Sequence, residues 1–357
     1  MAADGRTGFA ASQRNPATQV RAAIYNLSAM AISLHSFAKI NLGLAIGPRR
    51  EDGFHELRTV YQTIALSDRV RVEVARGRGI EVRCADPRVP ENDSNTCHRM
   101  AELVLATLGA QRRVTIHIDK CLPVQGGLGA ASSNAAATLF GLERALKTRL
   151  PAAERMRLAA AVGSDVPLFL VGGTVLGLGR GEEVYPLEDL PPLPCVVATP
   201  GTSVSTPQAF ADWDKLAETD PAGKLTGGAA SDRINACSHS MVWWLSGSPT
   251  GVPARKRGGD RAEALLLDLV RTGIENDFEQ VVFPQYPELR DVKSALIASG
   301  ARYVSLSGSG SAVYGLYGSA AAAKKAAARL KQQGIPALAT RTLPRREYWK
   351  RMFTARP

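Results

Sequence analysis

The chain has 357 residues, of which 45% are hydrophobic and 22% charged. This length exceeds one average domain, and the composition is that of an ordinary globular protein rather than a disordered one. No apolar run approaches the roughly 18 residues of a membrane span, and the first residues lack the apolar core of a signal peptide. We therefore expect a two-domain cytoplasmic protein with no membrane association.

The formal net charge of +11 favours anionic partners such as nucleotides, acidic metabolites or nucleic acid. Many positive residues lie near the N-terminus, in ARKRGGDR at 254–261 and in PRREYWKR at 344–351, which we predict to be solvated segments. With 6% aromatic residues and no recognisable module, a nucleic-acid-binding protein is a remote alternative.

The cysteines are odd in number, widely spaced and without a C-x-x-C pair, so they predict neither a disulfide framework nor a zinc site. They are Cys84, Cys97, Cys121, Cys195 and Cys237.

The first half of the chain alternates strand and helix signals. Residues 1–32 lack apolar periodicity and are predicted to form a flexible extension. Strands are predicted at 33–46, in two runs within 58–75, at 112–120 and at 173–179. Helices are predicted at 95–109, 132–147 and 151–163, and SDVP at 164–167 is predicted to be a loop. We predict that a first domain covers 33–190.

The second half begins with a change of pattern. Residues 215–260 are rich in small and polar types, with MVWWL at 241–245 as their main apolar feature, so we predict an insertion or linker there. Beyond it, signals for helix, strand, strand, helix and strand follow in the manner of an α+β sandwich, at 286–299, 302–308, 311–317, 321–333 and 336–343. A second domain is predicted at 191–350, with a tail at 351–357.

The most informative segment is PVQGGLGAASSNAAATL at 123–139. Glycines at 126, 127 and 129 allow positive φ angles, and Ser132 and Ser133 stand in the first turn of the predicted helix. Unpaired N–H groups at such a junction bind phosphate, and the hydroxyls can bond phosphate oxygens or a magnesium ion. No Walker lysine follows and no G-x-G-x-x-G is present, so spacing alone also allows a plain structural turn.

This loop resembles the second motif of the GHMP kinases, the family of galactokinase, homoserine kinase, mevalonate kinase and phosphomevalonate kinase. SFAKINLGL at 36–44 resembles the first motif, and SLSGSGSAVYGLY at 305–317 the third. The resemblance implies an α+β fold, with an N-terminal ribosomal-protein-S5-domain-2-like α/β domain and a C-terminal ferredoxin-like α/β sandwich. It also implies ATP as co-substrate together with Mg²⁺.

A finer resemblance is to members that act on a cytidine-diphosphate-linked methylerythritol in the non-mevalonate route to isoprenoids. It covers about residues 33–350 and is carried by AKINLGL at 38–44, DGFHEL at 52–57, GGLGAASSNAA at 126–136, SDVPLF at 164–169, PGTSVSTP at 200–207 and END at 275–277. It implies phosphorylation of the 2-hydroxyl of that substrate by a monomer or homodimer. A kinase for another small alcohol, such as homoserine or mevalonate, is the alternative.

The same resemblance implies the catalytic residues. Asp165 would be the general base, and Lys39 would orient it and offset developing negative charge. Without the resemblance, the residues favour a plainer interpretation, in which Asp165 caps a helix and Lys39 points outward from a strand. Asn41, on the same strand face as Lys39, is expected to help hold the substrate.

The resemblance also implies a cytosine site. Phe54 would stack on the base, His55 would bond its edge, and Phe210 would close the other side, although an isolated Phe-His pair is usually core. Thr206 is expected near the methylerythritol diphosphate. Gly308 and Gly310 are expected to let the backbone approach the substrate diphosphate, with a tight turn as the plain structural interpretation.

The ATP-binding residues implied by the resemblance are those of the glycine-rich loop and the start of its helix. They are Pro123, Val124, Gln125, Gly126, Gly127, Leu128, Gly129, Ala130, Ala131, Ser132 and Ser133. Asn95 and Lys120 are expected near the adenosine, and Mg²⁺ through the ATP phosphates with Ser132 or Ser133. Two features depart from the family pattern: Gln125 stands where glycine is usual, and the 215–260 insertion is long.

Overall fold

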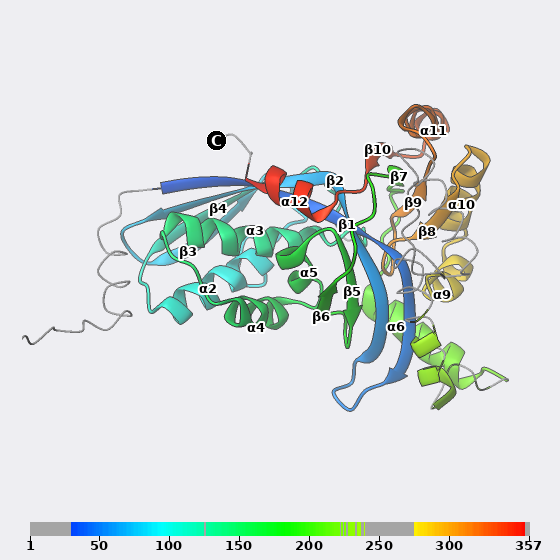
Figure 1. Ribbon diagram of the computed structural model, residues 1–357, viewed down its shortest axis with the longest axis horizontal. Coiled ribbons are helices and arrows are strands. Elements are labelled where there is room, and N and C mark those ends of the chain that lie inside the picture. The colour runs from blue at the N-terminus through cyan, green and yellow to red at the C-terminus, as the bar shows by residue number, and fades with distance from the viewer. Residues whose placement is uncertain are drawn as a thin grey trace, which may run out of the picture.

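The computed structural model describes residues 30–124, 126–221 and 275–353, with 223, 225, 228–232, 234–236 and 239 between them. Within these residues the strands form a six-stranded and a four-stranded sheet. Figure 1 shows the larger sheet, with its helices along one face, beside the smaller sheet and helices α9 to α11. No helix in the described part of the chain is long and apolar enough to cross a membrane.

The larger sheet has the strand order β3-β4-β2-β5-β6, with β1 paired to β2. Its strands are β1 (Met30–Arg49), β2 (His55–Ala75), β3 (Gly79–Cys84), β4 (Arg113–Asp119), β5 (Thr174–Leu178) and β6 (Glu183–Pro186). The helices packed with it are α2 (Thr96–Leu108), α3 (Ala130–Ala145), α4 (Ala152–Val162), α5 (Val166–Val171) and α12 (Arg345–Met352). The predicted helices at 95–109, 132–147 and 151–163 are therefore confirmed within a few residues.

Strands β1 and β2 form one long antiparallel ribbon, whereas two separate runs were predicted within 58–75. The alternation that marks an amphipathic strand holds in the second half of β2, where Val70, Val72 and Val74 are buried. It fails at 59–64, which is buried on both faces, so the pattern breaks without a break in the strand. Strand β1 also begins at Met30, inside the extension predicted for 1–32.

The smaller sheet has the order β10-β7-β9-β8 and is antiparallel throughout. Its strands are β7 (Pro194–Ala198), β8 (Tyr303–Leu306), β9 (Val313–Leu316) and β10 (Ala337–Arg341), and its helices are α6 (Thr206–Glu218), α9 (Glu279–Gln285), α10 (Pro287–Ala298) and α11 (Ala320–Gln332). This order and connectivity are those of the predicted ferredoxin-like sandwich.

The insertion predicted at 215–260 begins too early, because α6 continues to Glu218. The buried Trp213 of α6 packs into the hydrophobic core between the smaller sheet and its helices. The MVWWL segment at 241–245 lies outside the described residues.

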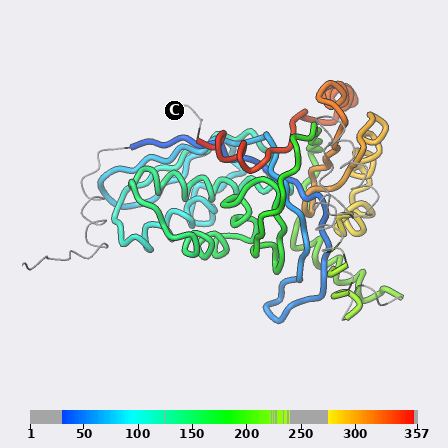
Figure 2. Tube along the Cα trace, in the orientation of Figure 1, coloured from blue at the N-terminus to red at the C-terminus, as the bar shows by residue number. Residues whose placement is uncertain are grey.

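The last helix corrects one prediction. PRREYWKR was predicted to be solvated, but α12 packs against the hydrophobic core of the larger sheet. Tyr348 is fully buried against Phe37 of β1, and its hydroxyl donates to the carbonyl of Phe169 at 2.7 Å. Figure 2 shows this red segment beside the blue first strand. Tyr348 and Met352 stand four residues apart, so one apolar stripe is buried while the charges stay outside.

An apolar layer joins the two sheets. It includes Ile40 and Leu42 of β1, Leu128 of the glycine-rich loop and Tyr314 of β9, all at 2% exposure or less. The Tyr314 hydroxyl donates to the carbonyl of Asn41 at 2.7 Å. This layer places the first, second and third sequence motifs side by side.

Candidate active site

Lys39 is buried at the junction of the two domains. Only 3% of the residue is exposed, and its Nζ donates to Asn41 Oδ1 at 2.8 Å. Asn41 in turn donates to Thr59 Oγ1 of β2 at 2.8 Å, and both side chains are buried. Lys39 Nζ also lies 3.4 Å from Asp165 Oδ2. Lys39 therefore points inward, contrary to the alternative of an outward-facing strand residue.

Asp165 stands immediately before α5, at a helix-capping position, in a stretch predicted to be a loop. Its side chain makes no capping hydrogen bond. Instead, Oδ1 accepts from the Tyr61 hydroxyl at 3.0 Å, and Oδ2 faces Lys39. The side chain remains 31% exposed, so one carboxylate is held by two side chains and still accessible from outside.

Tyr61 was not identified from the sequence. Burial raises the pKa of its phenol well above the usual range, and the neighbouring Asp165 carboxylate raises that pKa further. Tyr61 therefore stays protonated and acts as a donor. The only sequence signal was its inward position on β2, which is shared by ordinary core tyrosines.

The glycine-rich loop is in contact with both other motifs. Gly127 has a φ of 70°, and a Cβ there would lie 2.0 Å from the carbonyl oxygen of Ser307. Gly129 has a φ of 69°, and a Cβ there would lie 3.0 Å from Lys39 Cγ. Only glycine fits at either place. Lys39 N also donates to the Leu128 carbonyl at 3.0 Å, which ties the loop to β1.

A cleft of about 300 Å³ opens beside this loop. Every predicted ATP-binding residue that the structure describes lines it except Ser133: Asn95, Lys120, Pro123, Val124, Gly126, Gly127, Leu128, Gly129, Ala130, Ala131 and Ser132. Arg88, Val89 and Thr96 contribute further lining that the sequence analysis did not include. Gln125 lies outside the described residues.

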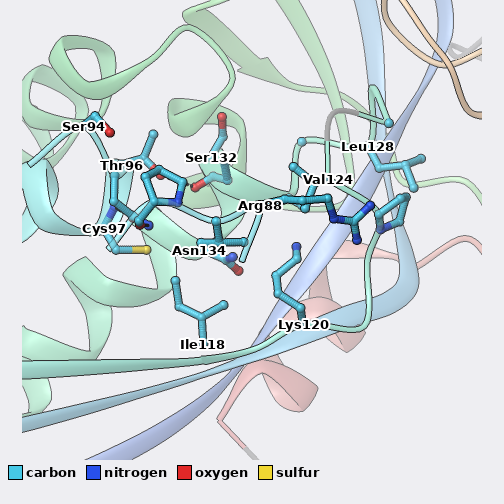
Figure 3. A pocket seen from close by; sticks show the side chains of 18 of the residues that line it. Arg88, Ser94, Thr96, Cys97, Ile118, Lys120, Val124, Leu128, Ser132 and Asn134 are labelled. Atoms are coloured by element: carbon cyan, nitrogen blue, oxygen red, sulfur yellow. Dashed lines mark hydrogen bonds between the residues drawn. The ribbon is translucent and has the colours of Figure 1, made fainter. Parts of the chain in front are cut away.

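The two serines of the loop differ. Ser133 is fully buried, its hydroxyl accepts from Ser36 at 2.7 Å, and it does not line the cleft. The reason is helical geometry, since consecutive residues lie about 100° apart around the axis. Ser132 is half-buried and lines the cleft, as Figure 3 shows.

Asp68 organises the chain just before the loop and was also missed. It accepts from Lys120 Nζ at 2.6 Å, from the backbone N–H groups of Cys121 and Leu122 at 2.8 Å, and from Asn134 Nδ2 at 3.1 Å. In Figure 3 Lys120 and Asn134 point toward one another. Lys120 reaches the cleft with its charge already paired.

Asn95 lines the cleft while capping α2. Its Oδ1 accepts from Cys97 N at 2.8 Å, and its Nδ2 donates to the Pro90 carbonyl at 2.6 Å. Because both ends of the amide are engaged, Asn95 shapes the wall of the cleft.

The residues predicted to bind cytosine lie near the turn between β1 and β2, where Phe210 stacks on His55. The His55 and Phe210 rings stack on each other, with centroids 5.0 Å apart and planes at 9°. His55 Nε2 lies 2.7 Å from Asp214 Oδ1 of α6. Phe54 is 51% exposed, and the Arg180 guanidinium lies 4.8 Å from its ring centre. Phe210 therefore contacts the ring of His55, while Phe54 contacts Arg180.

The remaining predicted residues surround the third motif. Gly308 has a φ of 56°, and a Cβ there would lie 3.4 Å from Lys39 Nζ. Asn276, from the END segment, donates to the carbonyls of Leu306 and Gly308. Gly310 has a φ of 94°. Thr206 begins α6, and its Oγ1 lies 2.7 Å from Ser309 Oγ, which links α6 to this turn.

The sequence profiles of two domains match the chain: "GHMP kinases N terminal domain" at residues 95–173 and "GHMP kinases C terminal" at 261–336. A 4-diphosphocytidyl-2-C-methyl-D-erythritol kinase from Solibacter usitatus is 37% identical over 80% of this chain and 80% of its own. The one from Moorella thermoacetica is 34% identical over 87% of this chain and 99% of its own. This chain belongs to that kinase family.

Solved structures agree with this membership. The crystal structure of a 4-(cytidine 5'-diphospho)-2C-methyl-D-erythritol kinase has a TM-score of 0.64 and 32% identity, over 87% of this chain and 99% of that chain. A homoserine kinase from Cytophaga hutchinsonii has a TM-score of 0.65 at 18% identity, over 89% of this chain and 96% of that chain, which shows the shared fold. The GHMP kinase fold predicted from the three motifs is confirmed, and the family is one of ATP-dependent phosphotransferases.

Proposed function

We propose that this protein transfers the γ-phosphate of ATP to the 2-hydroxyl of 4-diphosphocytidyl-2-C-methyl-D-erythritol, giving ADP and the 2-phosphate. The observation that carries the proposal is the contact of Lys39 with Asp165, next to Gly129 of the glycine-rich loop. The family membership supports the choice of substrate.

The arrangement suits phosphoryl transfer, which depends mostly on positioning and neutralisation of charge. ATP phosphates would lie against the backbone N–H groups at the start of α3. Asp165 would accept the proton of the 2-hydroxyl as that oxygen bonds to the γ-phosphorus and the bond to the ADP oxygen breaks. Lys39, held by Asn41, would offset the negative charge that develops on the transferred group.

Magnesium would enter with ATP. Among the described residues no group of three His, Cys, Asp or Glu side chains is placed to hold a metal ion. Ser132, the hydroxyl of the glycine-rich segment that lines the cleft, is our candidate ligand, with the ATP phosphates supplying the others. The ion would neutralise phosphate charge and hold the phosphates in place.

The contacts of His55 support recognition of cytosine. Its hydrogen bond to Asp214 favours a proton on Nε2, which leaves Nδ1 of the neutral ring as an acceptor. The amino group of cytosine is a donor on the edge of the base and complements that acceptor. We propose that Phe54, the exposed ring next to His55, stacks on the base. Thr206, Gly308 and Gly310 would lie along the diphosphate.

A substrate panel tests this proposal. Purified protein with ATP and Mg²⁺ should release ADP with the cytidyl substrate and should show no comparable turnover with homoserine or mevalonate, which have no base for His55 to bind. Coupled detection of ADP measures the rates. Faster turnover of homoserine or mevalonate than of the cytidyl substrate would favour the alternative, a GHMP kinase for another small alcohol. If the folded protein turned over none of the three substrates, both the proposed activity and this alternative would be wrong.

A further inference from the structure

A second cleft, of about 640 Å³, lies at the other end of α3 from the glycine-rich loop. Three aromatic rings line it. Phe140 meets Trp349 edge-on at 5.2 Å and Phe353 edge-on at 6.3 Å, while Trp349 and Phe353 are nearly parallel. Trp349 and Phe353 are only half-buried, so apolar ring surface remains open to the cleft.

The rim of this cleft is strongly basic. Arg144, Lys147 and Arg149 line it and are exposed, and within the described chain none of the three has a carboxylate partner. The only acid in the lining is Glu143, which accepts two hydrogen bonds from Arg155 and one from Leu150 N. Glu143 is neutralised by Arg155, so the rim keeps three uncompensated positive charges.

The backbone at Lys147 is unusual. Among the described residues it is the one non-glycine with a positive φ, at 49°, at the turn that ends α3. Helix ends of this kind usually carry glycine, because a side chain makes the left-handed conformation unfavourable. Termination of the helix therefore does not require lysine, and here its side chain adds a charge to the cleft.

We propose that this cleft binds a small organic phosphate whose remaining part is apolar or aromatic. The phosphate would meet Lys147, Arg149 and Arg144, and the apolar part would lie on Trp349 and Phe353. The Arg144 guanidinium is stacked 3.6 Å from the Phe353 ring centre, which leaves its N–H edges available to an oxyanion. Neither neutral apolar molecules nor bare phosphate would use both parts of the cleft.

The site is separate from the ATP cleft. Ser132 and Arg144 are twelve residues apart on one straight helix, which corresponds to roughly 18 Å along its axis. The two clefts have no lining residue in common. Substitutions on the rim of the second cleft leave the glycine-rich loop unchanged.

Ligand-observed NMR with phenyl phosphate tests the proposal on the full chain. Phenyl phosphate should bind wild-type protein more tightly than inorganic phosphate or phenol, each measured by displacement. Lys147→Gly and Arg149→Gln should each weaken phenyl phosphate binding by roughly fivefold or more, because each loses a charged contact. Lys325→Gln, which removes an exposed charge from α11, should leave binding unchanged.

Lys147→Gly also separates binding from folding. Glycine adopts the left-handed conformation freely, so the Tm of this variant should equal or exceed that of wild type. Equal binding by wild type, Lys147→Gly and Arg149→Gln, or no binding by wild type at millimolar ligand, would overturn the site. Inorganic phosphate binding as tightly as phenyl phosphate would overturn the assigned ligand class.

Discussion

The carboxylate of Asp165 is shared between a cation from β1 and a phenol from β2. Lys39 lies 3.4 Å from one oxygen and Tyr61 donates to the other at 3.0 Å. A carboxylate oxygen has two lone pairs, so both oxygens can still accept a proton or hydrogen bond. The two contacts fix the orientation of the group that we propose as the base.

Asp165→Asn should lower kcat by about 10²- to 10⁴-fold, since the amide keeps the shape but accepts no proton at neutral pH. ATP affinity should change little, because Asp165 does not line the glycine-rich cleft in which we place ATP. Steady-state kinetics and ATP-analogue titration measure the two effects. Near wild-type kcat would remove Asp165 from the role of base.

Tyr61→Phe tests the positioning of that base. The variant keeps the buried ring and loses one hydrogen bond to a charged acceptor, a bond of about 1.5–3 kcal/mol. We expect kcat to fall by roughly tenfold or more, with KM for ATP unchanged, if the full bond is needed in the transition state. Tyr185→Phe is a matched control, because the Tyr185 ring is 51% exposed. A change in Tm with unchanged kcat would assign Tyr61 a structural role only.

At the scale of secondary-structure elements, the buried carboxylate of Asp68 holds in place the segments on either side of the glycine-rich loop. Asp68, within β2, joins this strand to the segment after β4 and to α3, through two backbone and two side-chain donors. Gly127 meanwhile packs directly on the backbone of the third motif. The loop is thus fixed on both sides before any phosphate binds.

Asp68→Asn should destabilise the fold and weaken ATP binding together. The amide leaves the Lys120 ammonium without its buried counter-charge, and breaking such a pair costs about 3 kcal/mol. Urea denaturation and the KM for ATP measure the two effects. Asp119→Asn, one residue before Lys120 and exposed, is the control and should be near neutral. Equal stability of the two variants would contradict this account.

On the scale of the whole molecule, the chain ends by returning to its first domain. The hydroxyl of Tyr348 and the indole of Trp349 bond to the carbonyls of Phe169 and Val171 at the end of α5. Gly172 is needed there, because a Cβ would lie 2.3 Å from the Tyr348 ring. Helix α12 is thus hydrogen-bonded to the end of α5, the helix that begins after Asp165.

Tyr348→Ala should lower the free energy of unfolding by about 3–5 kcal/mol, through the cavity and the lost hydrogen bond. Lys350→Ala, on the exposed side of the same helix, should change it by less than about 0.5 kcal/mol. Chemical denaturation of both variants is the measurement. Similar denaturation midpoints for the two variants would mean that α12 does not stabilise the hydrophobic core of the larger sheet.

Local sequence patterns were sufficient to predict many of the helices and strands, and most of the residues that line the glycine-rich cleft. The helix at 95–109 and the strand at 112–120 were predicted because periodicity and terminators such as Gly109 act within a few residues. The glycine-rich loop was recognised for the same reason, and nearly all its described residues line one cleft. The domain boundaries and the roles of the site residues stay predictions.

The sequence by itself determined the family, the order of elements and the position of the glycine-rich loop, because these depend on residues close together in the chain. Only the tertiary structure decided that Tyr61 meets Asp165, that Asp68 holds the loop, that Ser132 rather than Ser133 faces the cleft, and that the last helix joins the first domain. These contacts link residues far apart in the chain, such as Phe37 and Tyr348. Distant contacts of this kind arise from how whole elements pack, and the periodicity of an element indicates which face is buried but not which distant element covers it.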